Sequence, residues 1–459
     1  MLLDPANSKM IASTMSTIAE TAADLEAGTI TSRALVESCL AAIADPEGEG
    51  DRAFLSVDEA GVRATADAMD TLRRHNRHPG AYTGIPIAIK DLFDVAGEVT
   101  TAGSKALADT PPAKVDAPVI ARLRRAGFLF VGRTNMTEFA YSGLGINPHY
   151  DTPRNPFDRA RGRVPGGSTS GGAVAVADGM ATVALGTDTG GSCRIPAAFC
   201  GIVGYKPTQR RVPLAGATPL SSSLDSIGPL AASVDCCARL DRLLAAEPEN
   251  PLPMRPVAGL RLAAPTNFVL DEMDETVARA FERTLDRLRG AGATVTEMTF
   301  AGFDRLGAIN AGGGFAAAES YAWHRPLIEA KADLYDPRVV SRIIRGKQQS
   351  AADYIDLLAA RQAMIEEAAA CFGAYDAMVM PTVPIVAPAL DQFGDDDTYG
   401  RLNMLALRNP STTNFLDGCA ISVPVHEAGA APVGLMLAGA PGGDRPLFQL
   451  ARGVEAAFS

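Results

Sequence analysis

The chain has 459 residues, of which 47% are hydrophobic and 21% are charged, and its net charge is -11 at neutral pH. This composition is typical of a globular protein with a sizeable core, so a disordered chain is not the default expectation. A phosphate-binding surface needs clustered Lys and Arg, and no such run occurs, so we expect no nucleic-acid partner.

Helices are predicted for the first part of the chain, which we place at residues 1–75. The predicted helices cover residues 14–25, 32–43 and 58–74. Apolar residues recur at helical spacing in the first helix, and Gly28 is expected to end it. Either Thr31 or Ser32 caps the second helix, because both side chains can accept a hydrogen bond from the first turn.

A strand–helix–strand rhythm begins at Gly84. GIPIAIKDLF is a short apolar run, which is typical of a buried strand, and this strand is expected to end at Lys90. Residues 115–125 have the pattern of a helix, and residues 128–131 that of the next strand. This alternation predicts an α/β fold with a largely covered sheet.

Residues 162–201 are dense in Gly, Ser, Thr and Ala. Flexible linkers have such compositions, but the apolar stretch over 173–185 argues against one here. Further helices are predicted over residues 277–288, 351–371 and 446–458. Further strands are predicted over residues 420–425 and 433–437 and at the start of 378–390, which continues into a Pro-rich loop. Because we find no linker and no internal repeat, one domain over 1–459 is preferred.

The seven Cys include no CxxC pair, and the five His include no H-x-x-x-H pair, so we predict no metal site and no disulfide framework. Reduced, mostly buried thiols indicate a cytoplasmic protein. The N-terminus lacks a basic start followed by a long apolar stretch, and no run of 18 apolar residues occurs. We therefore expect neither a signal peptide nor a membrane span.

Two Gly-Gly-Ser triplets end at Ser168 and Ser192, 24 residues apart. Gly permits positive φ and close approach of the backbone to a ligand, so residues 189–192 suit a loop whose N–H groups converge on an oxyanion. The segment lacks the Lys of a P-loop, the GxGxxG fingerprint and the GxSxG elbow. Two Gly-rich turns with incidental serines remain the alternative from composition alone.

A serine nucleophile needs a base, and none of the five His lies in a local catalytic context. Lys90 ends an apolar strand, and burial lowers the pKa of a Lys, which allows it to accept a proton. The alternative is a charge at the end of a strand that reaches solvent or pairs with Asp91 or Asp94.

GIPIAIKDLFDVAG, PGGSTSGG and GTDTGGSCRIPAAFCG, in this order, resemble the amidase signature family. The strong motifs cover residues 84–230, and a weaker match extends over nearly the whole chain, including GRTNMTEFA, MPTVP and AISVP. The resemblance implies one large domain with a mixed, mostly parallel central sheet covered by helices on both faces. It also implies an amidohydrolase that acts on a small-molecule amide without metal or cofactor, and a homodimer.

That family is similar to a Ser–Ser–Lys hydrolase whose bridging serine lies in a cis peptide. Ser192 resembles the nucleophile, Ser168 the bridging serine and Lys90 the base, which we expect to be neutral in the resting enzyme. The backbone N–H groups that resemble the oxyanion hole are those of Thr189, Gly190, Gly191 and Ser192.

Three neighbours of the nucleophile have other interpretations. Cys193 stands where Ile is usual, and we interpret it as a small packed residue rather than a second nucleophile. Asp188 and Arg194 are interpreted as an ion pair or as hydrogen-bond anchors of the loop, with exposed charge as the alternative. Residues 194–198 are expected to start a helix.

Substrate-binding residues are the least specific prediction. Ile195 matches a pocket position of the family and suggests an apolar wall, which argues against a small dicarboxylate monoamide. The other predicted pocket residues are Met136, Tyr141, Ser142, Gly143, Leu144 and Phe415. Core packing is the alternative for each of them.

Two functional classes remain open. The first is a free-standing amidase for a small, apolar aryl or alkyl amide, or for a related hydrazide or urea. The second is the glutaminase subunit of a tRNA-dependent amidotransferase, which would pass ammonia to a partner protein. Ile195 stands where Gln is common in that second branch, which favours the free-standing enzyme.

Overall fold

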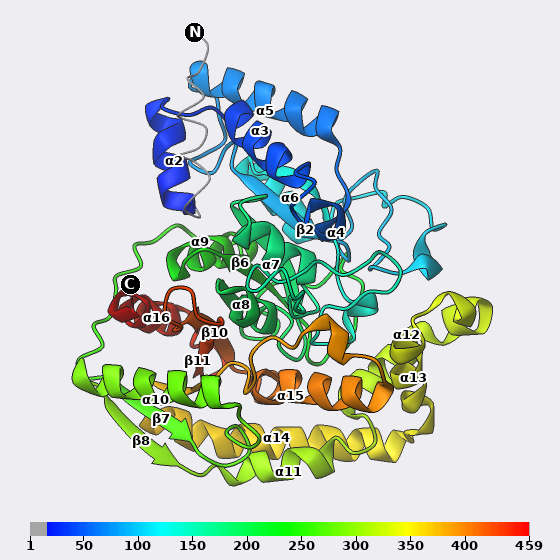
Figure 1. Cartoon of the computed structure of the whole chain (residues 1–459), viewed down its shortest axis with the longest axis vertical. Helices are drawn as coiled ribbons and strands as arrows, with labels where there is room; N and C mark the ends of the chain where they lie inside the picture. Colours follow the sequence, from blue (N-terminus) through cyan, green and yellow to red (C-terminus); the bar gives the residue numbers. More distant parts are fainter. Residues whose placement is uncertain (1–15, 459) are drawn as a thin grey trace.

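Eleven strands pair into one sheet within residues 16–458, the part of the chain that the computed structural model describes (Figure 1). Their order across the sheet is β1-β3-β2-β4-β6-β5-β10-β11-β9-β7-β8. The strands are β1 (Phe54–Ser56), β2 (Pro86–Lys90), β3 (Leu129–Thr134), β4 (Val183–Asp188), β5 (Val203–Lys206), β6 (Ser226–Ala231), β7 (Arg261–Pro265), β8 (Thr294–Met298), β9 (Ala377–Pro381), β10 (Cys419–Pro424) and β11 (Gly434–Gly439).

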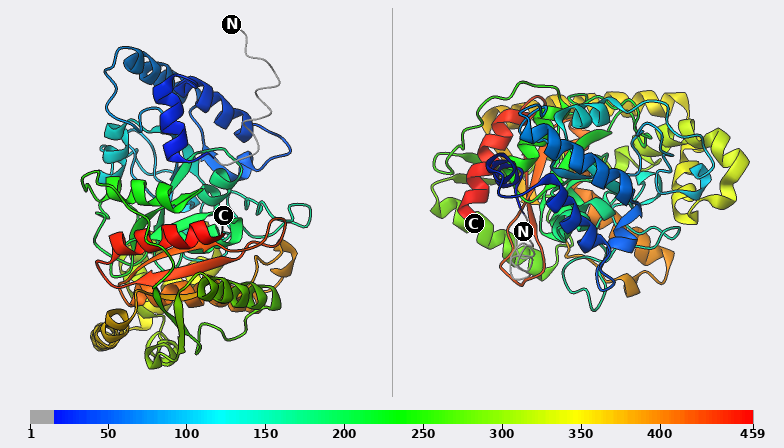
Figure 2. Two further views of the ribbon diagram at one scale, coloured as in Figure 1. Left: turned by 90° about the vertical axis from the view of Figure 1, so that its left-hand side faces the viewer. Right: turned by 90° about the horizontal axis from the view of Figure 1, so that it is seen from above.

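Helices surround this sheet. The α-helices are α2 (Ile18–Ala27), α3 (Ser32–Ile43), α4 (Gly50–Ala53), α5 (Glu59–Arg74), α6 (Pro118–Ala126), α7 (Ser170–Ala177), α8 (Arg194–Cys200), α9 (Val234–Leu244), α10 (Glu275–Gly290), α11 (Ala301–Ile309), α12 (Gly314–Lys331), α13 (Pro337–Ile344), α14 (Ala351–Ala374), α15 (Asp396–Phe415) and α16 (Asp444–Phe458). Short 3-10 turns are η2 (Lys105–Leu107), η3 (Glu138–Ala140), η4 (Ala332–Leu334), η5 (Arg345–Gln348) and η6 (Leu390–Gln392). The N-terminal helices lie at one end of the sheet, and α10, α11 and α14 lie at the other (Figures 1 and 2).

The two faces of the sheet are packed differently. Side chains alternate between the faces along each strand, so Val183 and Leu185 of β4 join one core and Ala184 joins another. The first face rests on one continuous core that includes α6, α9, α10 and α16. The opposite face has three separate cores, one with α3 and α5, one with α7 and α8, and one with α11, α14 and the end of α15.

The predicted α/β fold, with a mixed sheet covered on both faces, is confirmed. Parallel pairing occurs in two blocks, β3-β2-β4 and β9-β7-β8. Antiparallel pairing joins the other six neighbouring pairs, so parallel pairs are fewer than expected. The parallel block around β2 is the one that places the functional site, because carboxyl ends of adjacent parallel strands meet at one edge.

The predicted N-terminal helices appear as α2, α3 and α5. Gly28, at φ 70°, ends α2, and Thr31 rather than Ser32 caps α3 by accepting from the N–H of Ala34. Residues 1–15, which include the start of the first predicted helix, lie outside the described residues. None of the helices in the described range is long and apolar enough to cross a bilayer.

Two segments differ from what their sequence suggests. The apolar stretch 173–185 divides between α7 and β4, with a turn at Gly179, whose φ is 71°. Helix α15 was not predicted, because it contains Pro410 and its buried face carries polar residues. One of them, Asn409, donates to the carbonyl oxygens of Val269 and Pro381, both at 2.9 Å.

Candidate active site

Lys90 is the last residue of β2 and is completely buried. Its Nζ lies 2.8 Å from Oγ of Ser168 and 2.9 Å from Oγ1 of Thr187, and it hydrogen-bonds to both. Burial lowers the pKa of Lys90 to about 8, although nearby acidic groups partly oppose the shift. The direction matches the prediction, but the neutral amine predominates only above about pH 8. The alternative of a solvent-reaching charge is wrong.

Ser168 lies just before α7 and is also completely buried. The Gly167–Ser168 peptide is cis, as the family resemblance implies. The next residue, Thr169, donates its backbone N–H to the carbonyl oxygen of Ser192 at 3.3 Å, which joins the two Gly-rich loops. Within residues 16–458, no hydrogen bond connects the hydroxyls of Ser168 and Ser192.

Ser192 lies in the loop between β4 and α8, and a buried carboxylate holds that loop. Asp188 accepts the backbone N–H groups of Gly191 at 2.9 Å and Cys193 at 3.1 Å. Arg194 donates to both oxygens of Asp188, at 2.8 and 3.0 Å, and both side chains are fully buried. The predicted ion pair is therefore confirmed, and exposed charge is excluded.

The same carboxylate is linked to α15. Burial by itself would raise the pKa of Asp188, but the Arg194 guanidinium and the Asn414 amide hold it well below its usual range. Nη1 of Arg194 donates to the carbonyl oxygen of Pro410 at 3.0 Å, and Nη2 donates to Oδ1 of Asn414 at 2.6 Å. The loop of the candidate nucleophile is thus fastened to a helix more than 200 residues away in sequence.

The four N–H groups expected to form an oxyanion hole are not equivalent. The N–H of Gly191 donates to Asp188. The expectation that it would be free to bind an oxyanion is therefore wrong. The N–H groups of Thr189, Gly190 and Ser192 have no acceptor within residues 16–458. Gly191 has φ 126°, and a Cβ there would lie 2.6 Å from Cβ of Pro410. Only Gly fits this point of the loop.

The first residue of the loop has a side-chain partner that the sequence did not suggest. Oγ1 of Thr189 donates to Oδ1 of Asp225 at 2.5 Å. Asp225 lies directly before β6, and burial raises its pKa to about 6. Thr187 was missed as well, although pairing β2 with β4 in parallel would have placed it near Lys90.

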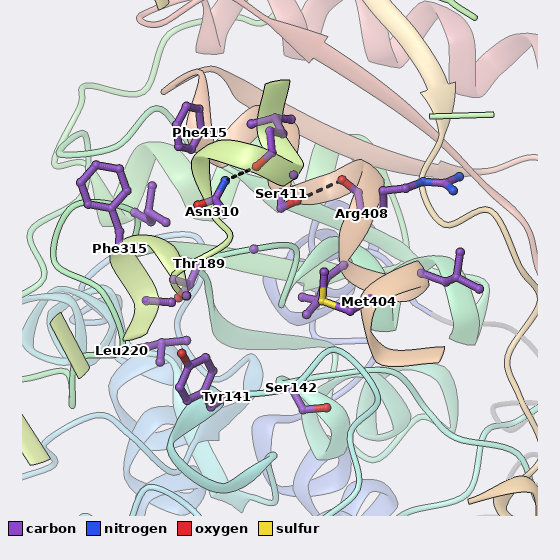
Figure 3. A pocket seen from close by; sticks show the side chains of 18 of the residues that line it. Tyr141, Ser142, Thr189, Leu220, Asn310, Phe315, Met404, Arg408, Ser411 and Phe415 are labelled. Atoms are coloured by element: carbon purple, nitrogen blue, oxygen red, sulfur yellow. Dashed lines mark hydrogen bonds between the residues drawn. The ribbon is translucent and has the colours of Figure 1, made fainter. Parts of the chain in front are cut away.

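A cavity of about 590 Å³ opens over this loop (Figure 3). Thr189, Gly190 and Ser192 form part of its wall. Apolar side chains from distant segments complete the wall: Leu220, Leu224, Phe268, Leu306, Phe315, Met404, Leu405, Leu407 and Phe415. Charged side chains also line it, namely Glu272, Arg345, Arg401 and Arg408. Most of these residues lie on segments for which the sequence offered no motif.

Of the predicted substrate-binding residues, Tyr141, Ser142 and Phe415 line this cavity. Four others do not line it and are packed in the core instead: Met136, Gly143, Leu144 and Ile195. A Cβ on Gly191 would lie 2.7 Å from Cδ1 of Ile195, which shows that Ile195 packs behind the loop. The core-packing alternative therefore describes these four residues.

Cys193, the other possible nucleophile of the loop, is buried. The thiol of Cys193 packs 3.6 Å from the carbonyl oxygen of Gly228, and burial raises its pKa. This position agrees with a packed small residue. The residues that the structure describes contain no cluster of three or more His, Cys, Asp or Glu placed to hold a metal ion.

A model of the amidase family matches residues 34–448. The chain belongs to the amidase family. This amidase is 38% identical over 444 residues to 2-amino-5-chloromuconic acid deaminase of Comamonas testosteroni, a match that covers 96% of this chain and 95% of that protein. It is 34% identical over 469 residues to a glutamyl-tRNA(Gln) amidotransferase subunit of Lacticaseibacillus paracasei, with 94% and 95% covered.

A crystal structure of an amidase superposes on this amidase with a TM-score of 0.87 and 32% sequence identity. The superposition covers 97% of this chain and 100% of that chain. The predicted family, its single-domain fold and the class of amidohydrolases are thereby confirmed.

Proposed function

We propose that this amidase hydrolyses the carbon–nitrogen bond of a small, largely apolar amide, with Ser192 as the nucleophile. The observation that carries the proposal is the buried hydrogen bond between Lys90 and Ser168 at 2.8 Å, next to a loop that presents Ser192 to the cavity. A buried Lys of lowered pKa is a competent proton acceptor, and a hydroxyl beside it can relay a proton.

In the proposed acylation step, neutral Lys90 accepts the proton of Ser168 while Ser168 accepts the proton of Ser192. Oγ of Ser192 then forms a bond with the carbonyl carbon of the substrate. This step requires the two serine hydroxyls to come into hydrogen-bond contact when the substrate binds, as often happens when catalytic geometry tightens. The free N–H groups of Thr189, Gly190 and Ser192 are the donors available to the oxyanion.

The leaving nitrogen needs a proton, because an amide anion is a poor leaving group. Protonated Lys90 supplies it through Ser168, and the amine or ammonia departs. Water then attacks the acyl-enzyme and gives its proton to the same relay. The relay returns this proton to Oγ of Ser192 as the bond between Oγ and the acyl carbon breaks, and the carboxylic acid is released. All proton transfers in this scheme use Lys90, Ser168 and Ser192.

The cavity supports an apolar acyl group, because Phe268, Phe315, Phe415 and several Leu side chains line its wall. Arg345, Arg401 and Arg408 favour a second candidate, a carboxylate-bearing substrate that releases ammonia. The name of the deaminase relative indicates such a substrate for that protein.

The glutaminase subunit stays the alternative from another class, because the amidotransferase relative covers nearly the whole chain. Ile195 does not decide against it, since this side chain does not line the cavity. We favour an enzyme that acts without a partner protein, and we place it in the cytoplasm as a homodimer. Light scattering after gel filtration measures the oligomeric state.

The proposed function is tested by assaying ammonia or amine release from a panel of substrates. The panel contains acetamide, benzamide, an anilide, a hydrazide, a urea, glutamine and a 2-aminodienoic acid. Wild type and Ser192→Ala are assayed together. Cleavage of apolar amides by wild type alone supports the proposal. Release from glutamine alone supports the amidotransferase alternative, and undiminished activity of Ser192→Ala excludes the mechanism.

A further inference from the structure

The segment 220–225 lies beside the nucleophile loop, and both contribute residues to the cavity wall. Leu220 and Leu224 line the cavity, while the carboxylate of Asp225 is buried beneath them. This carboxylate accepts the backbone N–H of Leu220 at 3.0 Å and that of Ser221 at 3.1 Å. It also accepts the hydroxyl of Thr189 at 2.5 Å. One side chain thus joins the cavity wall to the first residue of the nucleophile loop.

The same segment is braced from the opposite side by α12. Glu319 accepts the hydroxyl of Ser221 at 2.6 Å and the backbone N–H of Ser223 at 3.0 Å. Tyr354 of α14 donates its hydroxyl to Glu319 at 2.6 Å. Asp225 is therefore part of a hydrogen-bonded frame that extends to the helices around the cavity, and its position is fixed from several directions.

Thr189 is the first residue of the nucleophile loop, directly after β4. Gly190 and Gly191 follow it, and Gly restricts the backbone less than any other residue. The N–H of Gly191 is held by Asp188, but the N–H groups of Thr189 and Gly190 have no acceptor among the described residues. The peptide unit before Thr189 is held through the Asp188 carbonyl, which accepts the hydroxyl of Ser226 at 2.8 Å and the amide of Asn414 at 3.2 Å. The hydroxyl of Thr189 adds a further hydrogen bond on the side of the loop that leads into Gly190.

We propose that Asp225 is a positioning residue of this amidase, and that its hydrogen bond to Thr189 aims the loop N–H groups at the oxyanion. The proposal rests on the proposed function, because it assumes that Ser192 is the nucleophile. Preorganised donors stabilise a transition state because they need no reorientation as charge develops. Loss of the anchor is therefore expected to lower kcat more than it raises KM.

The test uses Asp225→Asn, Thr189→Val and the double variant in the full-length protein. Thr189→Val keeps the shape of the side chain but removes its hydroxyl. In Asp225→Asn, the amide N–H groups face either Thr189 or the N–H donors of the 220–221 turn. Thr189→Ser is the conservative variant that restores the hydroxyl. Asp241→Asn is the matched control, because Asp241 is a buried carboxylate on α9 that pairs with Arg211.

Two measurements are made on each variant. The first is the rate at which a fluorophosphonate probe labels Ser192, a reaction in which the serine oxygen displaces fluoride from phosphorus and the phosphoryl oxygen occupies the oxyanion position. The second is kcat and KM for the fastest amide of the panel. Thermal melting reports whether each variant is folded, and Thr189→Val keeps the test usable if Asp225→Asn does not fold.

We expect each single variant to lower kcat and the labelling rate by about 10- to 100-fold, with KM changed less than about threefold. The double variant is expected to be no slower than the worse single variant, because both remove one interaction. Thr189→Ser is expected to restore most of the kcat and labelling rate that Thr189→Val loses, and Asp241→Asn is expected to stay within about threefold of wild type.

Additive losses in the double variant would overturn the proposal, and so would a change confined to KM or a Thr189→Ser variant as slow as Thr189→Val. If wild type is labelled at Ser192 and the variants react at the wild-type rate, the positioning role fails while the proposed function stands. Absence of both labelling and turnover in wild type contradicts the proposed function, and the positioning role is withdrawn with it.

Discussion

Nζ of Lys90 donates to Oγ of Ser168 across 2.8 Å, and both residues are completely excluded from solvent. The candidate base and the bridging serine are thus fixed inside the protein, whereas Ser192 belongs to a separate loop that reaches the cavity. Asp188 and Arg194 hold that second loop without touching the first pair. The two halves of the proposed relay therefore have different main anchors, although the N–H of Thr169 also joins their loops by donating to the carbonyl oxygen of Ser192.

Ser192→Ala is expected to lower turnover by at least about 1,000-fold, because it removes the hydroxyl that we propose as the nucleophile. Cys193→Ala is the control at the adjacent position and is expected to keep most activity, since the Cys193 thiol is buried and its raised pKa disfavours the thiolate. Both are measured as initial rates of ammonia or amine release. Greater loss in Cys193→Ala than in Ser192→Ala would contradict the assignment.

The pH dependence follows from the lowered pKa of Lys90. Its neutral form is the proposed base, and burial lowers its pKa to about 8, so kcat/KM is expected to rise with pH and to level off above about pH 8. Lys90→Met is expected to lose this rise together with nearly all activity. A profile that is flat from pH 6 to 9, or that falls through pH 8, would exclude Lys90 as the base.

Arg194→Met is expected to lower the free energy of unfolding by about 3–5 kcal/mol, because it leaves the buried carboxylate of Asp188 without its cation. Arg279→Met is the surface control. Its guanidinium pairs with Glu275, both side chains are more than half exposed, and its loss is expected to cost less than about 1 kcal/mol. Urea denaturation followed by circular dichroism measures both. Equal effects would mean that the ion pair does not hold the loop.

Phe315→Ala is expected to raise KM for aryl amides by about tenfold, since removal of roughly 50 Å² of apolar contact is worth about 1.4 kcal/mol. KM for acetamide is expected to change little, because acetamide has no ring to contact this wall. Ile355→Ala, which replaces an exposed side chain of α14 outside the cavity wall, is the control. Equal changes in KM for aryl amides and acetamide would show that the aryl ring does not contact Phe315.

The proton-relay candidates could be predicted because their sequence signals are local. Lys90 ends a short apolar run, and Ser168 and Ser192 follow Gly pairs, so strand and turn chemistry place them without knowledge of distant segments. The cavity wall could not be predicted in this way. Leu220, Phe268 and Phe315 lie on three separate segments, and only the packed sheet brings them to Ser192.

Ile195 illustrates the opposite error. Its position three residues after Ser192 suggested a pocket wall, but the first turn of α8 directs it behind the loop, against Gly143 and Gly191. A helical residue is directed by the turn in which it lies, and sequence distance from a functional residue does not give this direction. Helix α15 was missed for a related reason, because buried polar residues such as Asn409 are satisfied by tertiary hydrogen bonds that the sequence does not show.

Helix α15 contributes to two parts of the site. Met404 and Leu407 line the cavity, while Pro410 and Asn414 accept hydrogen bonds from Arg194. A substitution that reshapes this wall also risks moving the support of the nucleophile loop. Leu306 on α11 lines the same cavity. Within residues 16–458, no hydrogen bond joins α11 to the Asp188–Arg194 ion pair. Changes of substrate range, in evolution or by engineering, are therefore expected to accumulate on α11 before they reach α15.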